Sequence, residues 1–178
     1  MAINSDETES QEDSDNETAG IQGTVVAAIE FLCTIIEKKA FAKVVQIGVP
    51  PLIPSLMIFL QPSAGQINAW EDDPDRFVEE EDDEVMLCSV RTTAMDLLLC
   101  IAKDHLEVLL PPLLEYVGES QSGSASWQQR ESAYYIIGAV ASALEEEHMT
   151  KFNIRGYLEG PTLRDLKSGK FSVHFFFF

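Results

Sequence analysis

The chain has 178 residues, 46 % of them hydrophobic, and a net charge of −18 at pH 7. This length and apolar content are sufficient for one domain with its own core. The strongly negative charge argues against direct binding to nucleic acid phosphates and favours basic proteins as partners.

The acidic residues gather in two stretches. Residues 1–20 contain seven acids and no base, and residues 71–84 contain ten acids and one base. Because residues 1–20 carry few apolar side chains, their burial cannot offset the entropy lost on ordering. We therefore predict a disordered acidic segment over residues 1–20, followed by a nearly neutral helical body over residues 21–160.

Apolar residues at helical spacing predict three helices before residue 61. The first begins after Thr24, a candidate N-cap, and ends near Ile36. The second runs from about Phe41 to Gly48. The third covers about Pro51–Leu60, because proline is best tolerated in the first turn of a helix.

Residues 62–84 form an acidic insertion. It is predicted to hold a short helix over Gln66–Trp70, a turn at Asp73–Pro74 and then a run of acids. Helical periodicity returns over residues 85–103 and breaks at residues 104–105. A Leu-rich helix follows from Leu106, and its internal prolines, 111 and 112, predict a kink or a new helix start.

The clearest helix is expected over Trp127–Glu147, after a Ser/Gly loop at residues 118–126. First helices of successive pairs then begin near residues 24, 85 and 128, and the last interval is about 43 residues, as in HEAT and armadillo repeats. The first interval approaches the same length once the insertion is removed. We predict an all-α fold, an α-solenoid of HEAT-type helical hairpins; an ordinary helix bundle is the alternative.

Two motifs are similar to sequences of the importin-β superfamily. Trp127, Arg130, Glu131, Ala133 and Gly138 resemble a signature of its HEAT repeats. The stretch from Trp70 to Glu84, with the helix that begins near Ser89 and the segment Asn153–Leu158, resembles the importin-9 branch of these karyopherins. The resemblance covers about residues 21–160 and places them in the middle of a longer receptor.

This resemblance implies a nuclear transport receptor that shuttles between cytoplasm and nucleus. The implied partners are basic cargo such as histones and ribosomal proteins, the small GTPase Ran and nucleoporins. The alternative is a HEAT-repeat scaffold, or an acidic histone-chaperone-like protein, that does not depend on Ran. Residues 161–178 match nothing in the family and end in four phenylalanines, so we interpret them as an artefactual or disordered tail.

The insertion is the main candidate site. Its adjacent carboxylates favour contact with basic cargo or with the GTPase, whereas a plain solvated loop is the alternative. Two aromatic residues, Trp70 and Phe77, are predicted to anchor the loop, and Trp127 is interpreted as a repeat-core residue. The candidate contact residues are Glu79, Glu80, Glu81, Asp82, Asp83 and Glu84.

The sequence gives little support for a catalytic, metal-binding or phosphate-binding site. The three histidines are far apart, and no Gly-rich phosphate loop or nucleophile–base pair is present. Cys33, Cys88 and Cys100 are interpreted as small buried side chains in a reducing compartment. We expect no enzyme activity, cofactor, metal or membrane insertion.

Overall fold

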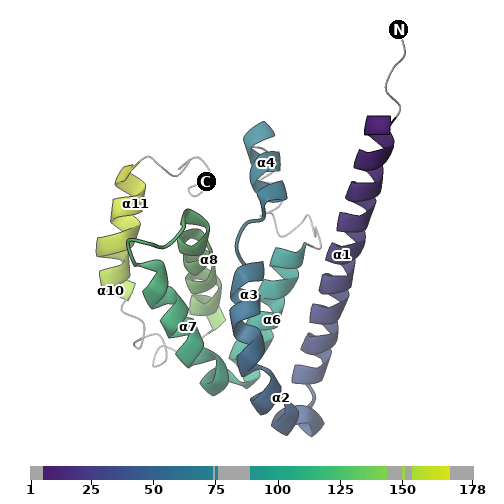
Figure 1. The fold of residues 1–178 in the computed structure, drawn as a ribbon. Helices are drawn as coiled ribbons and strands as arrows, with labels where there is room; N and C mark the ends of the chain where they lie inside the picture. Colours follow the sequence, from purple (N-terminus) through teal and green to yellow (C-terminus); the bar gives the residue numbers. More distant parts are fainter. Residues whose placement is uncertain (1–5, 74, 76–88, 144–149, 151–153, 169–178) are drawn as a thin grey trace.

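The computed structural model describes residues 6–73, 75, 89–143, 150 and 154–168, with side chains from residue 20 onward. In this part of the chain every regular element is a helix (Figure 1). The expected all-α helical repeat fold is confirmed.

The helices are arranged in two layers. α1 (Asp6–Ile36), α6 (Val90–Asp104) and α8 (Trp127–Ala143) lie next to one another in the first layer. α3 (Ile53–Phe59) and α7 (Leu106–Ser120) form the second layer, and each also contacts α6. This stacking of first helices on first helices and second helices on second helices is the arrangement of an α-solenoid.

One continuous core joins the layers. Leu60, Leu98, Leu109 and Ile136 come from different segments and are each 0 % exposed. Burying side chains of this size contributes about 1.5–3 kcal/mol each, so the interface between layers provides much of the folding free energy. The apolar stripes identified in the sequence are therefore the faces that meet.

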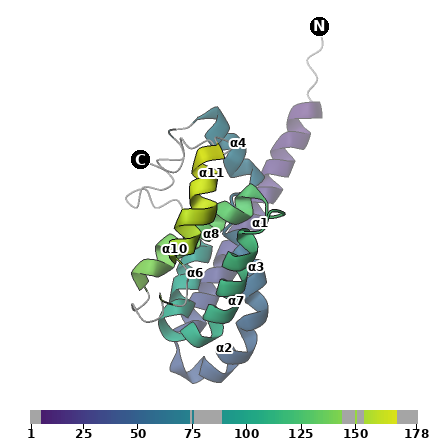
Figure 2. The same cartoon turned by 90° about the vertical axis from the view of Figure 1, so that its left-hand side faces the viewer.

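Short elements connect the layers. η1 (Lys39–Phe41), α2 (Ala42–Gly48) and η2 (Pro50–Leu52) turn the chain from α1 into α3, close to the predicted boundaries. Beyond α3, α4 (Ala64–Asp72) covers the predicted short helix of the insertion. At the other end α10 (Ile154–Tyr157), the π-helical turn η3 (Leu158–Thr162) and α11 (Leu163–Ser168) follow α8 (Figure 2).

The first helix is longer than predicted. α1 begins at Asp6, so residues 6–20 are helical where the sequence predicted a disordered segment. Thr24 is not an N-cap, because its hydroxyl donates to the carbonyl of Gly20 inside the helix, at 2.9 Å. Once the packed second half of α1 has formed, adding turns to it no longer carries the nucleation cost of a new helix.

Helix boundaries after the insertion also differ from the prediction. α6 begins at Val90 because Ser89 caps it, and α8 begins at Trp127, an interval of 37 residues. α7 runs from Leu106 to Ser120 through both of its prolines, so the predicted alternative of a new helix start near Pro111 is wrong. Its buried apolar face outweighs the lost backbone hydrogen bonds.

The body does not end at residue 160. Pro161 is buried, and residues 161–168 belong to η3 and α11, although the sequence predicted a tail from residue 161. The four phenylalanines lie outside the described residues.

Candidate functional site

The helix of the insertion, α4, begins with a capping box. The Ser63 hydroxyl accepts from the Gln66 backbone N–H, while the Gln66 side chain accepts from the Ser63 backbone N–H. This exchange satisfies two donors that the start of a helix leaves unpaired. The local sequence Ser63-Ala-Gly-Gln66 thus sets where α4 begins and how Trp70, two turns later, is placed.

Trp70 lies against a buried ion pair. Its side chain is 7 % exposed, and the Arg91 guanidinium of α6 lies 6.0 Å from its ring centroid. The same guanidinium lies 4.4 Å from the ring of Tyr135 and pairs with the Glu131 carboxylate, both on α8. One arginine therefore connects the insertion to two successive first helices.

The aromatic faces explain how Arg91 is tolerated in the interior. Arg91 and Glu131 are each 4 % exposed, and burying a charge is costly unless it is paired. Nε and Nη1 of Arg91 have no hydrogen-bond partner within the described parts of the chain. Their contact with electron-rich ring faces supplies part of the missing stabilisation.

Only some of the predicted site residues lie among the residues that the structure describes. Trp70 is placed as above, whereas Phe77 and the six carboxylates of residues 79–84 lie outside the described residues. The prediction of a contact surface at these carboxylates therefore stays a prediction. Four acids of the same insertion are described, and all are exposed: Glu71, Asp72, Asp73 and Asp75.

The described parts of the two acidic stretches lie toward the same end of the molecule. α4, which carries Glu71 and Asp72, projects beyond α3 and α6 in both views (Figures 1 and 2). The acid-rich first half of α1 projects at that end too. Segments separated by about fifty residues thus both place negative charge at this end of the molecule, where it favours the approach of a basic partner.

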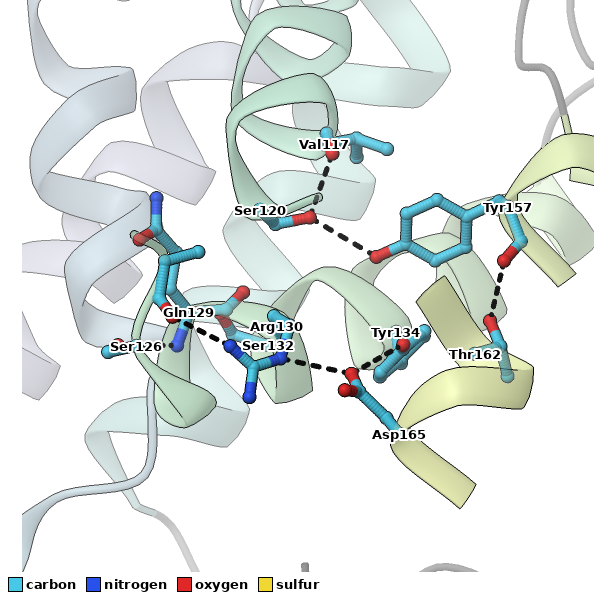
Figure 3. Close-up of polar contacts among 11 residues, drawn as sticks. Val117, Ser120, Ser126, Gln129, Arg130, Ser132, Tyr134, Tyr157, Thr162 and Asp165 are labelled. Carbon is cyan, nitrogen blue, oxygen red and sulfur yellow. Dashed lines mark hydrogen bonds and ion pairs between the residues drawn. The ribbon is translucent and has the colours of Figure 1, made fainter. Parts of the chain in front are cut away.

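A second polar cluster ties α8 to the last helices. Asp165 of α11 accepts hydrogen bonds from Arg130 Nε and the Tyr134 hydroxyl, each at 3.0 Å (Figure 3). Burial, together with Asp165, raises the pKa of Tyr134 well above its ordinary value. The Tyr157 hydroxyl meets the buried Ser120 hydroxyl at 3.2 Å. These contacts are structural, and two of them involve Asp165, a residue of the predicted tail.

Two adjacent signature residues therefore have separate structural roles. Glu131 pairs with the preceding first helix through Arg91, and Arg130 pairs with the following segment through Asp165. Trp127, which was expected in the core, is instead 36 % exposed at the start of α8. As the first residue of its helix, it lies at the edge of the stacked layer, where neighbouring helices cover it incompletely.

Within the described residues no three His, Cys, Asp or Glu side chains are arranged to hold a metal ion. No single described helix has the length and hydropathy to cross a membrane. The pair Gly20–Ile36 and Lys39–Gly48 reaches those values only together, across a bend of 93°.

Comparison with known proteins finds a partial similarity to a curated protein. No family model matches the chain. Over 104 residues the chain is 29 % identical to Importin-9 of Drosophila melanogaster, and this stretch covers 58 % of the chain and 10 % of that protein. The chain thus spans only about a tenth of this relative, and the similarity points to the importin-β family at most.

Proposed function

We propose that this chain is a segment of a nuclear transport receptor whose acidic end binds basic cargo proteins. The supporting observation is that α4 and the acid-rich half of α1 both project at the same end of a helical-repeat body. The similarity to Importin-9 supports the transport role, since that name denotes an import receptor. The role is binding and not catalysis.

The geometry suits recognition by charge. The described acids of α4 are exposed, so they keep their hydration until a partner arrives. Exposed carboxylates speed association and set specificity more than they add affinity, and salt screens them. Histones and ribosomal proteins have the Lys/Arg-rich segments that fit such a region. In the intact receptor, Ran-GTP would release the cargo, and the receptor would shuttle between cytoplasm and nucleus.

A matched pair of variants tests the binding region. Neutralising Glu71, Asp72 and Asp73 to Gln or Asn should weaken binding of a fluorescent histone-tail peptide to the full chain. Exposed pairs contribute about 0.2–1 kcal/mol each, so the three together should change Kd by about threefold to a hundredfold at low salt. The control variant neutralises Glu107, Glu115 and Glu119, three exposed acids of α7.

Both variants change the net charge equally, so only position distinguishes them. We expect the α7 variant to bind nearly as the parent chain does, and the α4 variant to show a flatter dependence of Kd on salt. Equal losses in the two variants would mean that net charge alone attracts the peptide. Neutralising residues 79–84 extends the same test to the predicted contact residues.

Dependence on Ran separates transport from the alternative. Cargo bound to the longer receptor should be displaced by Ran-GTP and not by Ran-GDP. Cargo that remains bound at saturating Ran-GTP would instead support a HEAT-repeat scaffold or an acidic histone-chaperone-like protein.

A further inference from the structure

The first helical hairpin leaves apolar surface uncovered. α1 packs against α6, and no described helix lies on the opposite side of α1 (Figure 1). α3 likewise ends the second layer, with α6 and α7 as its main neighbours. The large hydrophobic side chains exposed on α1, on α3 and on the turn between them make up what we call the outer face: Ile21, Phe31, Phe41, Val44, Ile47, Leu52, Ile58 and Phe59.

The outer face is larger than the apolar surface that a monomer normally exposes. Its side chains are between 38 % and 79 % exposed. Since a large aromatic side chain has about 150–250 Å² to bury, eight large side chains about half exposed leave roughly 600–800 Å² of apolar surface. Apolar patches of this size are typical of interaction sites. A standard interface buries about 800 Å² on each partner, so the area matches what one partner of a stable dimer needs.

The charge around the outer face favours a second copy of this chain as the partner. Residues 21–70 contain two acids, Glu30 and Glu37, and three bases, Lys38, Lys39 and Lys43, which gives a net charge of +1 in a chain of −18. Two copies therefore repel each other through their acidic regions but not through this one. All five charged side chains are exposed, so in a symmetric pair the lysines of one copy can lie opposite the glutamates of the other.

We propose that the chain forms a twofold symmetric dimer in which the outer faces of two copies pack together. A twofold arrangement pairs one patch with itself, so it uses the large patch on both sides and closes at two copies. Among the described residues, the last helices expose only Leu158, Leu163 and Leu166, too few for a standard interface. The dimer does not depend on cargo binding, because no outer-face residue is acidic.

The first measurement is the mass of the full chain in solution. Sedimentation velocity should show a species of twice 19.8 kDa, with a Kd of about 1 µM or tighter for an interface of this area. Added salt should strengthen the dimer, because it screens the repulsion between two chains of charge −18. Salt should instead weaken peptide binding at the acidic end, so dimer formation and cargo binding can fail independently.

Two matched variants locate the interface. Val44→Glu with Ile47→Lys places one charge of each sign on the outer face and should raise the Kd of the dimer by about tenfold or more, because burying these groups is costly. Leu158→Lys with Leu163→Glu makes the same change on the last helices and should leave that Kd unchanged. All four positions are exposed in the single chain, so circular dichroism should show unchanged helix content in both variants.

Hydrogen exchange of the unaltered chain gives a test that needs no substitution. As the protein concentration rises through the Kd of the dimer, amide protons of α2 and of residues 21–36 should exchange more slowly. Those of α11 should exchange at the same rate at every concentration.

Any of four results would overturn the proposal. A chain that stays monomeric at about 100 µM, well above the expected Kd, would leave the outer face to a different partner. A mass that keeps growing with concentration, or loss of association in both variants, would indicate head-to-tail contact between unlike ends. A dimer that salt dissociates would be held by charge. Binding of an otherwise monomeric chain to phosphatidylcholine vesicles would assign the outer face to a lipid surface.

Discussion

Removing one partner of the buried Arg91–Glu131 pair should destabilise the fold far more than removing both. The pair joins α6 to α8, and its side chains are 5 % and 6 % exposed. Glu131→Gln keeps the shape of the side chain but leaves the Arg91 charge without its counter-ion. Arg91→Met with Glu131→Leu replaces both by apolar groups of similar volume.

The expected magnitudes are well separated. An uncompensated buried charge costs about 3–5 kcal/mol, whereas an apolar replacement of the whole pair is near neutral or stabilising. Losing the cation–π contact with Tyr135 costs about 0.5–2 kcal/mol, which methionine partly recovers through its own contacts with aromatic rings. Since domains of this kind have about 5–15 kcal/mol of stability in all, Glu131→Gln should lower the midpoint of urea unfolding by a large fraction.

Urea unfolding, monitored by circular dichroism, measures the effect. The dependence of the unfolding free energy on urea concentration must be the same in all variants for the values to be compared. The control is Glu159→Gln, because its partner Arg155 is 86 % exposed and Glu159 itself 65 % exposed. An exposed i,i+4 pair contributes at most about 0.5 kcal/mol. If Glu131→Gln cost no more than Glu159→Gln, or if the double variant were the least stable of all, the buried charge would not be what matters.

Two further perturbations follow from the same structure. Burial raises the pKa of Tyr116, Tyr134 and Tyr157 above 10.0, so the folded chain keeps protons that the unfolded chain loses near that pH. Tm should therefore fall as pH rises above about 10. Tyr134→Phe should make this fall in Tm shallower, and an unchanged profile of Tm against pH would show that Tyr134 titrates normally. Ser89→Ala removes the N-cap of α6 and should lower the free energy of urea unfolding by about 1 kcal/mol. The control Ser55→Ala, at an exposed position inside α3, should leave it unchanged. Equal effects of the two substitutions would contradict the capping role of Ser89.

The helical repeat could be predicted because its signal is local. The apolar spacing of α6 and α8 predicts which faces are buried, and the structure confirms Leu98, Ile101 and Ile136 on them. Helix ends were less predictable. Thr24 has the chemistry of a cap, but the favourable extension of an existing helix past it depends on the packing of residues further along the chain.

The candidate site could be predicted only where a single residue is unusual in its local sequence. Trp70 stands out because a large aromatic side chain in an acidic stretch needs a place to be buried. Glu131 belongs to the repeat signature, but its pairing with Arg91 could not be predicted, because it spans 40 positions and exists only once α6 and α8 pack. Asp165 was assigned to the tail for the same reason, since its partners Arg130 and Tyr134 lie a full helix earlier.

Arg130 and Glu131 form ion pairs with the segments that follow and precede α8, and this affects the cooperativity of unfolding. In a repeat array each unit gains stability mainly from its immediate neighbours, so ends tend to fray independently. Here a single turn of α8 is bonded backward to α6 and forward to α11, so opening α8 breaks both ion pairs in one event. Amide protons of α6, α8 and α11 should then exchange with solvent as one unit, while the projecting half of α1 exchanges on its own.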